Sequence, residues 1–266
     1  MNNLTWIIEN FAKEPSYKEL QDAVKESGAN LITLNGDYTK NQISDQVKEG
    51  SVVLSGSIEM VKLVKDELRR NSKCNLFLET DFSKYRCSKY YSHFGAKLFN
   101  DVYAIISLSE LKRRLFYYYG LFGKEALIFI RPDSGEKEFQ AQLLDVIDFD
   151  KFYETNKHLA HELVVISTPK KVLAEWRVLV SHTEVIDYSL YRYQDQVSKI
   201  HACPSNVIDF CNEVVKVGYH PDKIYCVDAF MGYDNEVYLG ELTSFESCGL
   251  YAMNKTKIVE YISKHL

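Results

Sequence analysis

Two spacings of hydrophobic residues organise the first third of the chain. Short apolar runs predict strands at LTWIIENF, ANLITL, SVVLSGS and CNLFLE. The segment PSYKE supplies a capping box, with Ser16 as N-cap and Glu19 three residues on, and a helix runs from it to about Gly28. A second helix is predicted at IEMVKLVKDELRR. Strands that alternate with single helices predict a parallel, Rossmann-like sheet.

The pattern changes to hairpins after residue 101. Strands are predicted at EALIFIRP, FQAQLLDVI and ELVVIST, and hairpins at AEWRVLV–SHTE–VIDYSLYRY and KIYCVDAFM–GYDN–EVYLGELTSF. Helices are predicted at FDKFYETNKHLAH, PSNVIDFCNEVVKVG and NKTKIVEYISKHL. This order predicts an α+β fold built on antiparallel sheets, behind a small α/β domain. The segment 80–100 lacks clear periodicity, and we place the boundary within it, so that the first domain covers 1–95.

Composition excludes several classes of protein. The 266 residues are 46% hydrophobic and 26% charged, which is typical of an ordinary globular protein. A net charge of -5 gives no global basic field for nucleic acid and no polybasic membrane anchor. No apolar run approaches the length of a membrane helix, no GxGxxG follows a strand, and the six cysteines form no CxxC pair. We therefore expect a cytoplasmic protein with reduced thiols and no dinucleotide site.

The last hairpin carries one carboxylate in each strand. Residues paired across an antiparallel hairpin have a constant index sum, so a two-residue turn at 234–235 places Asp228 directly opposite Glu241, with Thr243 on the same face. A four-residue loop keeps this arrangement, whereas a three-residue loop separates the two acids. Opposed carboxylates repel each other unless a cation intervenes, and hard oxygen ligands suit Mg²⁺ held together with substrate phosphates. The alternative is a pair of edge carboxylates answered by nearby Lys or Arg.

A second polar group follows a buried strand. Arg131 ends the run FIRP, and Lys137 comes six residues later, beyond a loop that contains Ser and Gly. Two cations around such a loop can cradle a polyphosphate with help from backbone N–H groups. Asp133 and Glu136 make the loop acidic, and the alternative is a surface turn with ordinary charges.

A third group lies in the EWR hairpin. With SHTE as the turn, Arg177 faces Tyr188 and Glu175 faces Leu190, and both share a face with Arg192. An Arg–Glu pair on a sheet is usually structural, but two arginines beside a carboxylate also make an anion clamp. Basic and aromatic residues also interleave at 84–91 and 112–119, as they do in proteins that bind single-stranded nucleic acid; solvated helix faces are the alternative there.

Taken in order, these groups resemble the ATP-grasp ligases. Members of that superfamily have a Rossmann-like pre-domain and an ATP domain whose two α+β lobes hold the nucleotide between antiparallel sheets. The segments FIRPDSGEKEF, ELVVIS, EWRVLVS…VIDYSLYR and DAF…YLGELTSFESCGLY are similar to its phosphate, hinge and metal motifs. Arg-Pro replaces the usual Lys-Pro, as in a clade associated with phages and bacteria, and TWIIEN and VVLSGSIEMV also resemble that clade. The resemblance implies an ATP-grasp domain over 96–266, with lobes of about 96–168 and 169–266.

The resemblance also implies roles for single residues. Arg131 and Lys137 would bind ATP phosphates, Glu175 would belong to the nucleotide site, and Arg177 would steady the transferred phosphate. The backbone of the hinge strand would hold adenine through Val164, Val165, Ile166 and Ser167. The ligands of Mg²⁺ would be Asp228, Glu241 and Thr243.

Two of these assignments depart from the family pattern. Thr243 stands where the family has Asn, and a hydroxyl offers one oxygen but no amide carbonyl. The family's first nucleotide lysine has two candidates in this chain, Lys97 and Lys124.

The resemblance implies an ATP- and Mg²⁺-dependent ligase that joins a small-molecule or peptide carboxylate to an amine through an acyl-phosphate. The first alternative is an ATP-binding protein of the same fold with impaired turnover, and Thr243 is the feature that favours it. A nucleic-acid-binding protein is the second alternative, which the charge of -5 argues against. No membrane partner is expected, and a homodimer stays open.

Overall fold

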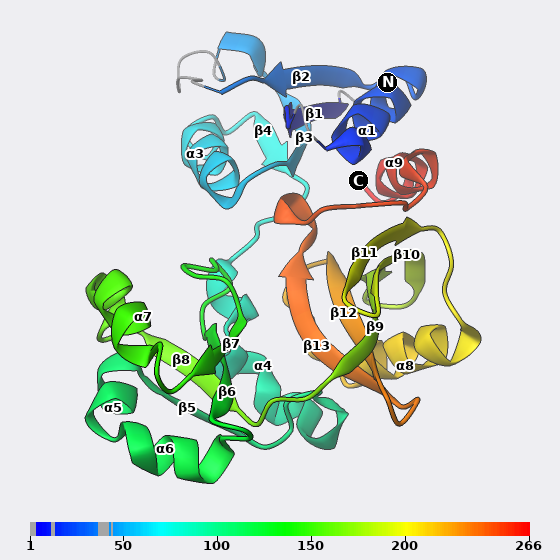
Figure 1. The fold of residues 1–266 in the computed structure, drawn as a ribbon. Coiled ribbons are helices and arrows are strands. Elements are labelled where there is room, and N and C mark those ends of the chain that lie inside the picture. Colours follow the sequence, from blue (N-terminus) through cyan, green and yellow to red (C-terminus); the bar gives the residue numbers. More distant parts are fainter. Residues whose placement is uncertain (1–3, 12–13, 37–42, 44) are drawn as a thin grey trace. The chain divides into compact units, whose positions relative to one another are not determined.

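The computed structural model describes residues 4–11, 14–36, 43 and 45–266 (Figure 1). The chain divides into two units, each built from separate stretches of sequence. Unit 1 comprises Met1–Thr80, Ala174–Ala229 and Glu241–Leu266, and unit 2 comprises Asp81–Leu173 and Phe230–Gly240. The predicted division into domains at residue 95 stays a prediction. Within the described ranges, no helix has both the length and the apolar character needed to cross a membrane.

One sheet of unit 1 is parallel throughout. Its strands, in the order β2-β1-β3-β4, are β1 (Leu4–Glu9), β2 (Asn30–Leu34), β3 (Gly50–Ser55) and β4 (Cys74–Leu76). Every neighbouring pair in this order is parallel. The helices α1 (Pro15–Glu26) and α3 (Ile58–Leu68) follow β1 and β3 along the chain. The predicted parallel pairing is therefore confirmed, while its assignment as a Rossmann-like pre-domain stays a prediction.

The predicted N-cap of the first helix is wrong. The helix α1 begins at Pro15 with Glu14 as N-cap, and Ser16 is buried within the first turn. Proline suits the first helical position because its φ is already helical and it has no N–H to satisfy. A side-chain cap occurs instead on α3, where the Ser57 hydroxyl accepts a hydrogen bond from the backbone N–H of Met60 at 3.2 Å.

The second sheet of unit 1 has five strands in the order β11-β10-β9-β12-β13. They are β9 (Val172–Ser181), β10 (Val185–Tyr193), β11 (Gln196–Ile200), β12 (Ile224–Gly232) and β13 (Val237–Ser244), and the tips of some of them belong to unit 2. The helix α8 (Ser205–Lys216), the short 3₁₀ helix η4 (Phe245–Ser247) and the helix α9 (Lys255–Lys264) complete the unit (Figure 1). The sequence does not predict β11, because its residues are mostly exposed and show no clear alternation.

One hydrophobic core serves both sheets of unit 1. It contains residues from the parallel sheet, such as Trp6, and from the five-stranded sheet, such as Leu179 and Ile224. Residues of the C-terminal segment join the same cluster, including Phe245 and Ile258. The last part of the chain is therefore needed to bury the first strand.

Unit 2 is built on a four-stranded antiparallel sheet in the order β5-β8-β6-β7. Its strands are β5 (Tyr103–Ser107), β6 (Leu127–Pro132), β7 (Gln142–Asp145) and β8 (Leu163–Ser167). Its helices are η1 (Phe82–Tyr85), α4 (Cys87–Phe94), η2 (Gly95–Lys97), α5 (Leu108–Arg113), α6 (Leu115–Phe122), α7 (Phe149–Thr155) and η3 (Lys157–Leu159). The strands β6, β7 and β8 are as the sequence predicts, whereas β5 lies in a segment for which only helix is predicted.

The central strand β8 separates two faces of this sheet. Val164 and Ile166 belong to the hydrophobic core that includes residues of α5, α6 and α7. Because side chains alternate along a strand, Val165 and Ser167 lie on the other face. Arg131 of β6 pairs directly with Val165, so its side chain shares that face.

Candidate functional site

Arg177 and Asp228 form a buried ion pair on neighbouring strands of the five-stranded sheet. Arg177 lies on β9 and Asp228 on β12, with 7% and 2% of their surfaces exposed. The guanidinium contacts the carboxylate twice, with Nε donating to Oδ1 at 2.8 Å and Nη2 donating to Oδ2 at 2.7 Å. Two such charge-assisted bonds offset much of the cost of removing both charges from water. The pair thus keeps two opposite charges inside the protein.

Part of the Arg177 guanidinium is still available for an anion. Its Nη1 donates to the backbone carbonyl of Gly249 at 3.2 Å. A guanidinium has five N–H donors, so two of them, one on each terminal nitrogen, have no hydrogen-bond partner among the described residues. Adjacent N–H groups on the two terminal nitrogens match the oxygens of a phosphate or carboxylate. Arg177 can therefore bind an oxyanion while it remains bonded to Asp228.

Two stacked tyrosines lie beside Arg177. The rings of Tyr191 and Tyr251 are 5.1 Å apart and 14° from parallel. The Arg177 Cζ lies 5.5 Å from the centroid of the Tyr191 ring and 5.2 Å from that of the Tyr251 ring. Cation–π contacts at this range favour a fixed guanidinium. The sequence does not predict either tyrosine, because neither belongs to a motif and the pair forms between residues 60 positions apart.

Glu175 is fixed by the same tyrosine and by Arg192. The Tyr191 hydroxyl donates to Glu175 Oε2 at 2.6 Å, and Arg192 Nη1 lies 3.2 Å from Glu175 Oε1. Burial raises the pKa of Glu175 above its ordinary value, and the bond from Tyr191 opposes that rise. The predicted shared face of Glu175 and Arg192 is confirmed, but this carboxylate is already bonded within the protein.

The predicted register of the β9–β10 hairpin is right beside its turn and wrong further on. The pairing shifts twice along β10, as it does where a strand carries a bulge. Arg177 consequently lies opposite Ser189 and not Tyr188, and Glu175 lies opposite Arg192, two positions beyond its predicted partner. No glycine marks these shifts in VIDYSLYRY, so the constant index sum misplaces the partners.

The predicted two-residue turn between β12 and β13 is also wrong. The N–H of Gly232 donates to the carbonyl of Glu236 at 3.1 Å, and the N–H of Asn235 donates to the carbonyl of Gly232 at 3.1 Å. The loop therefore has three residues, and Asn235 takes the left-handed conformation at φ 64° that such a loop requires. Asparagine tolerates this conformation better than most residues do.

The three-residue loop changes the expected position of Asp228. Continued without a bulge, its register sets Asp228 opposite Gly240, one position before Glu241. Glu241 and Thr243 still lie on β13, the strand next to β12 in the sheet. A bulge of the kind found in β10 is needed to bring Glu241 onto the face of Asp228, and their common metal site stays a prediction.

In unit 2, Arg131 and Ser167 lie on the face of the sheet opposite its helices. Arg131 is buried at the end of β6, and its Nη1 lies 3.5 Å from the carbonyl oxygen of Gly240. Ser167 is buried at the end of β8, and its hydroxyl has no hydrogen-bond partner among the described residues. A buried hydroxyl without a partner costs about 1–3 kcal/mol, so a ligand that supplies one is favoured there. The geometry thus agrees with the predicted place of the hinge, without testing it.

The acidic residue of the predicted phosphate loop is turned into the protein. Asp133 is fully buried and accepts hydrogen bonds from Arg86 Nε at 2.9 Å and from the N–H and hydroxyl of Ser88 at 2.6 and 2.8 Å. Lys137, at the other end of the loop, is exposed and has a φ of 58°. The charge of Asp133 is neutralised by Arg86, so it does not oppose an anion near the loop. The sequence alone treats this acid as exposed and unfavourable.

The runs of basic and aromatic residues do not form a surface for single-stranded nucleic acid. Such a surface needs exposed rings on which bases can stack. Of the tyrosines in the two runs, Tyr117 is 50% exposed, and the following are buried: Tyr85, Tyr90, Tyr91, Tyr118 and Tyr119. Arg113 is bonded to Glu110 at 2.8 and 3.0 Å. The solvated-face alternative is the better description of these helices, with their aromatic side chains in the core.

Comparison with known families identifies the fold. Residues 114–261, more than half of the chain, match the sequence profile of an ATP-grasp domain, the second family of its clade. The chain belongs to the ATP-grasp family. No curated protein sequence matches it significantly.

Solved structures show the same fold at low sequence identity. The D-cycloserine synthetase DcsG aligns with a TM-score of 0.66 and 11% identity over 98% of this chain and 99% of its own. The D-alanyl-alanine synthetase A from Vibrio cholerae O1 biovar eltor str. N16961 aligns with a TM-score of 0.65 and 11% identity, over 99% and 98% of the two chains. The ATP-grasp ligase PsnB, in complex with a minimal precursor, Mg and ADP, aligns with a TM-score of 0.57 and 12% identity over 97% of each chain.

The ATP-grasp family uses ATP with Mg²⁺, and the oxygen donors of unit 1 fit such a cation. The hydroxyl of Thr243 is buried and has no hydrogen-bond partner in the described part of the chain. Asp228 has lone pairs beyond the two that Arg177 occupies. Hydroxyl and carboxylate oxygens are the hard ligands that Mg²⁺ prefers. The described residues contain no group of three or more His, Cys, Asp or Glu side chains suited to a metal ion.

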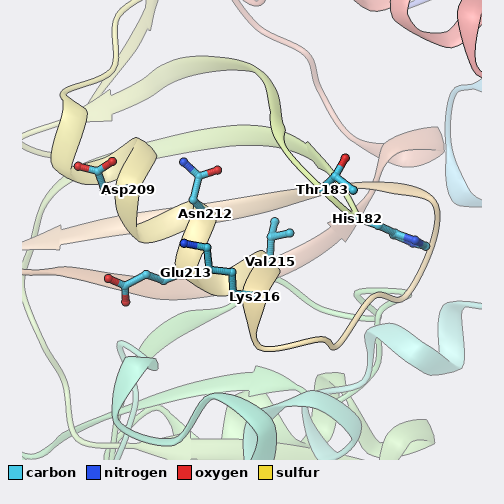
Figure 2. A pocket seen from close by; sticks show the side chains of 7 residues that line it. All are labelled: His182, Thr183, Asp209, Asn212, Glu213, Val215 and Lys216. Atoms are coloured by element: carbon cyan, nitrogen blue, oxygen red, sulfur yellow. The ribbon is translucent and has the colours of Figure 1, made fainter.

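The best-formed pocket lies away from the predicted ATP-grasp residues. It has a volume of about 360 Å³ and lies between the helix α8 and the turn that joins β9 to β10 (Figure 2). Figure 2 shows its lining side chains, which are His182, Thr183, Asp209, Asn212, Glu213, Val215 and Lys216. None of them is a predicted nucleotide or metal residue. Most of the side chains on the helix are exposed and of mixed charge, and we assign this pocket no ligand.

Proposed function

We propose that this chain is an ATP- and Mg²⁺-dependent ligase that joins a carboxylate to an amine. The observation that carries the proposal is the Arg177–Asp228 pair, which holds a guanidinium in place inside a member of the ATP-grasp family and leaves two of its N–H groups for an oxyanion. A ligase of this kind needs a fixed positive group where the phosphoryl group is transferred. Arg177 meets that need without moving.

The reaction would proceed in two steps. A substrate carboxylate oxygen attacks the γ-phosphorus of ATP, and the bond to the bridging oxygen breaks to give an acyl-phosphate and ADP. The amine then attacks the acyl carbon, phosphate leaves with the electron pair of the C–O bond, and the nitrogen loses a proton to give the amide. Negative charge spreads over the transferred phosphoryl oxygens, where Arg177 would stabilise it.

The remaining residues would bind and orient ATP. Arg131 and Lys137 would contact its phosphates, supported by the burial of Asp133 away from the loop surface. Glu175 would keep its place in the nucleotide site through the bonds from Tyr191 and Arg192. The backbone of the hinge strand β8 would hold adenine, over Val164, Val165, Ile166 and Ser167.

Magnesium would be held by oxygen ligands of unit 1. Those ligands would be Asp228, Glu241 and Thr243. When bound, the cation offsets phosphate charge and helps to orient the phosphates. The orphan hydroxyl of Thr243 supports this assignment, and the three-residue turn before β13 argues against a simple shared face of the two acids.

The names of the structural neighbours support an amide- or peptide-type product. They are described as a D-alanyl-alanine synthetase, a D-cycloserine synthetase and a ligase in complex with a precursor. We therefore propose amino acids, small peptides or related amines as substrates. A second candidate is an ATP-binding protein that has lost turnover, because Thr243 supplies a hydroxyl where the family has an amide.

A thermal-shift titration with Mg-ATP, followed by ADP release in the presence of pooled amino acids and peptides, tests the proposal. We expect stabilisation by Mg-ATP and ADP release that depends on one pool. Arg177→Gln should abolish release, and Arg192→Gln, which removes an arginine 48% exposed at its side chain, is the matched control. Binding without release in every pool would favour the second candidate. Failure to bind Mg-ATP would end both.

A further inference from the structure

Tyr251 has an unusual backbone conformation close to Arg177. Its φ is 44°, in the left-handed region that residues with a side chain rarely adopt. Such a conformation costs about 1–3 kcal/mol and persists only where the surroundings fix it. Tyr251 lies two residues after Gly249, whose carbonyl accepts a hydrogen bond from Arg177. The strained residue is therefore part of the segment that surrounds the guanidinium.

A buried lysine holds this segment in its conformation. Lys255 is 5% exposed, and its Nζ donates to the backbone carbonyls of Tyr251 and of Met253, the latter at 2.8 Å. The same Nζ lies 3.2 Å from a carboxylate oxygen of Glu19 on α1. Burial lowers the pKa of Lys255, and the bond to Glu19 opposes that change. A buried ammonium group with three partners is an anchor for the turn that precedes α9.

The anchored turn places the Tyr251 ring against Arg177. The ring stacks on Tyr191, and the two rings together flank the guanidinium at 5.2 and 5.5 Å. Asp228 fixes one edge of the guanidinium and the Gly249 carbonyl fixes another. The aromatic contacts restrict the remaining freedom, which is rotation of the guanidinium plane. The direction of the two spare N–H groups depends on that plane.

We infer that Tyr251 is a positioning residue for Arg177, and that Lys255 sets it in place. In this scheme the Tyr251 ring keeps the two spare N–H groups aimed at the transferred phosphate of ATP. The inference rests on the proposed function for its ligand, but the placement of Arg177 by Tyr251 can be measured without any nucleotide. The backbone strain at Tyr251 is retained because the ring is needed at that point.

Arginine-selective labelling tests the placement directly. Purified protein is treated with phenylglyoxal, and modification of Arg177 is followed by peptide mass spectrometry. We expect Tyr251→Gly to raise the labelling rate of Arg177 by about fivefold or more, because the guanidinium loses its aromatic cover. Glycine tolerates a positive φ, so this variant removes the ring and relieves the strain together. Tyr251→Phe keeps the ring and should label like the wild type.

The matched control is Tyr188→Leu. The Tyr188 ring is also stacked in unit 1, on His201 at 4.9 Å, and it pairs with Val178 on β9. Its removal should leave the labelling of Arg177 unchanged. Lys255→Met provides a second variant, in which the ring remains but its anchor is lost, and we expect an intermediate rate. An unchanged rate in Tyr251→Gly overturns the inference.

Nucleotide binding tests the consequence for the proposed reaction. Affinities for Mg-ADP and for Mg-AMPPNP, which carries a third phosphoryl group, are measured by calorimetry. Tyr251→Gly should weaken Mg-AMPPNP by about fivefold or more and leave Mg-ADP unchanged, because Arg177 contacts only the last phosphate. Equal weakening of both nucleotides would show general damage and overturn the inference. Wild-type protein that binds neither nucleotide would overturn the proposed function, and the labelling result would still decide the placement of Arg177.

Discussion

The side chains of Lys65 and Glu246 meet inside unit 1, with Nζ 2.5 Å from Oε2 and 3% and 1% of the side chains exposed. Lys65 lies on α3, and Glu246 lies in η4, directly after β13. The carbonyl of Glu246 also accepts a hydrogen bond from the N–H of Gly56 at 2.8 Å. This ion pair fixes the end of the strand that carries Glu241 and Thr243 to the parallel sheet.

The pair makes stability depend on pH. Burial raises the pKa of Glu246 from 4.5 to about 7, although Lys65 lowers it. Between these values the folded protein holds a proton that the unfolded chain has lost, so this group lowers the stability as pH rises through that window. We expect Glu246→Gln to remove the dependence. The free energy of unfolding of the variant minus that of the wild type should increase from pH 4.5 to 7, by an amount on the order of 3 kcal/mol. A constant difference across that range would contradict the prediction.

Breaking the Arg177–Asp228 pair should destabilise the protein more than removing it. Arg177→Met or Asp228→Leu leaves one buried charge without its partner, and each should cost about 3–5 kcal/mol in urea unfolding. The double variant should recover most of that loss, because no isolated charge remains. Its ability to release ADP should stay absent. Additive losses in the double variant would show that the two residues do not act as a pair.

Thr243→Val should stabilise the protein without ligand and weaken its response to Mg-ATP. Valine has nearly the same shape and removes the buried hydroxyl that has no partner in the described structure. The gain should be about 1 kcal/mol, measured as a shift in the melting temperature without nucleotide. The stabilisation by Mg-ATP should decrease at the same time if Thr243 contacts the metal. Thr243→Asn, which introduces the family's amide, is the companion variant and should increase ADP release.

Asp133 should be more important for folding than its exposed neighbour in the same loop. Asp133→Asn removes the charge that answers Arg86 and exchanges one acceptor for a donor. We expect a loss of about 2–4 kcal/mol in unit 2 and weaker binding of Mg-ATP, because the loop that carries Lys137 loses its anchor. Glu136→Gln changes the same charge on the exposed side and serves as the control. Its effect on unfolding should stay within about 0.5 kcal/mol.

Much of the fold was predictable because its signals are local. Apolar runs bounded by Pro132 and Gly218 mark a strand and a helix correctly, since proline and glycine act through their own backbone conformations. The parallel sheet follows from alternating strands and helices, and its pairing is as predicted. The N-cap was misplaced because Pro15 and Ser16 are both acceptable at the start of a helix, and only the packed structure decides between them.

The site was less predictable because its geometry depends on non-local contacts. The side chains of Glu175 and Arg192 were assigned to one face correctly, but two shifts along β10 changed their exact partners. No local pattern distinguishes a buried Asp133 from an exposed one. Tyr251 and Lys255 gave no signal, since their roles depend on a positive φ and on a lysine buried against backbone carbonyls. The family resemblance placed Arg177 correctly beside the proposed metal residue Asp228, which spacing alone did not.

The composition of the unit 1 core has a consequence for synthesis of the chain on the ribosome. The ring of Trp6 packs against that of Phe245 at 6.4 Å, and the same core includes Ile258. The first strand is therefore made long before the residues that bury it, at the usual elongation rate of about 5–20 residues per second. The nascent parallel sheet must wait for the last segment with its apolar face uncovered. A fragment that stops at the predicted boundary near residue 95 would remain in that exposed state and should aggregate.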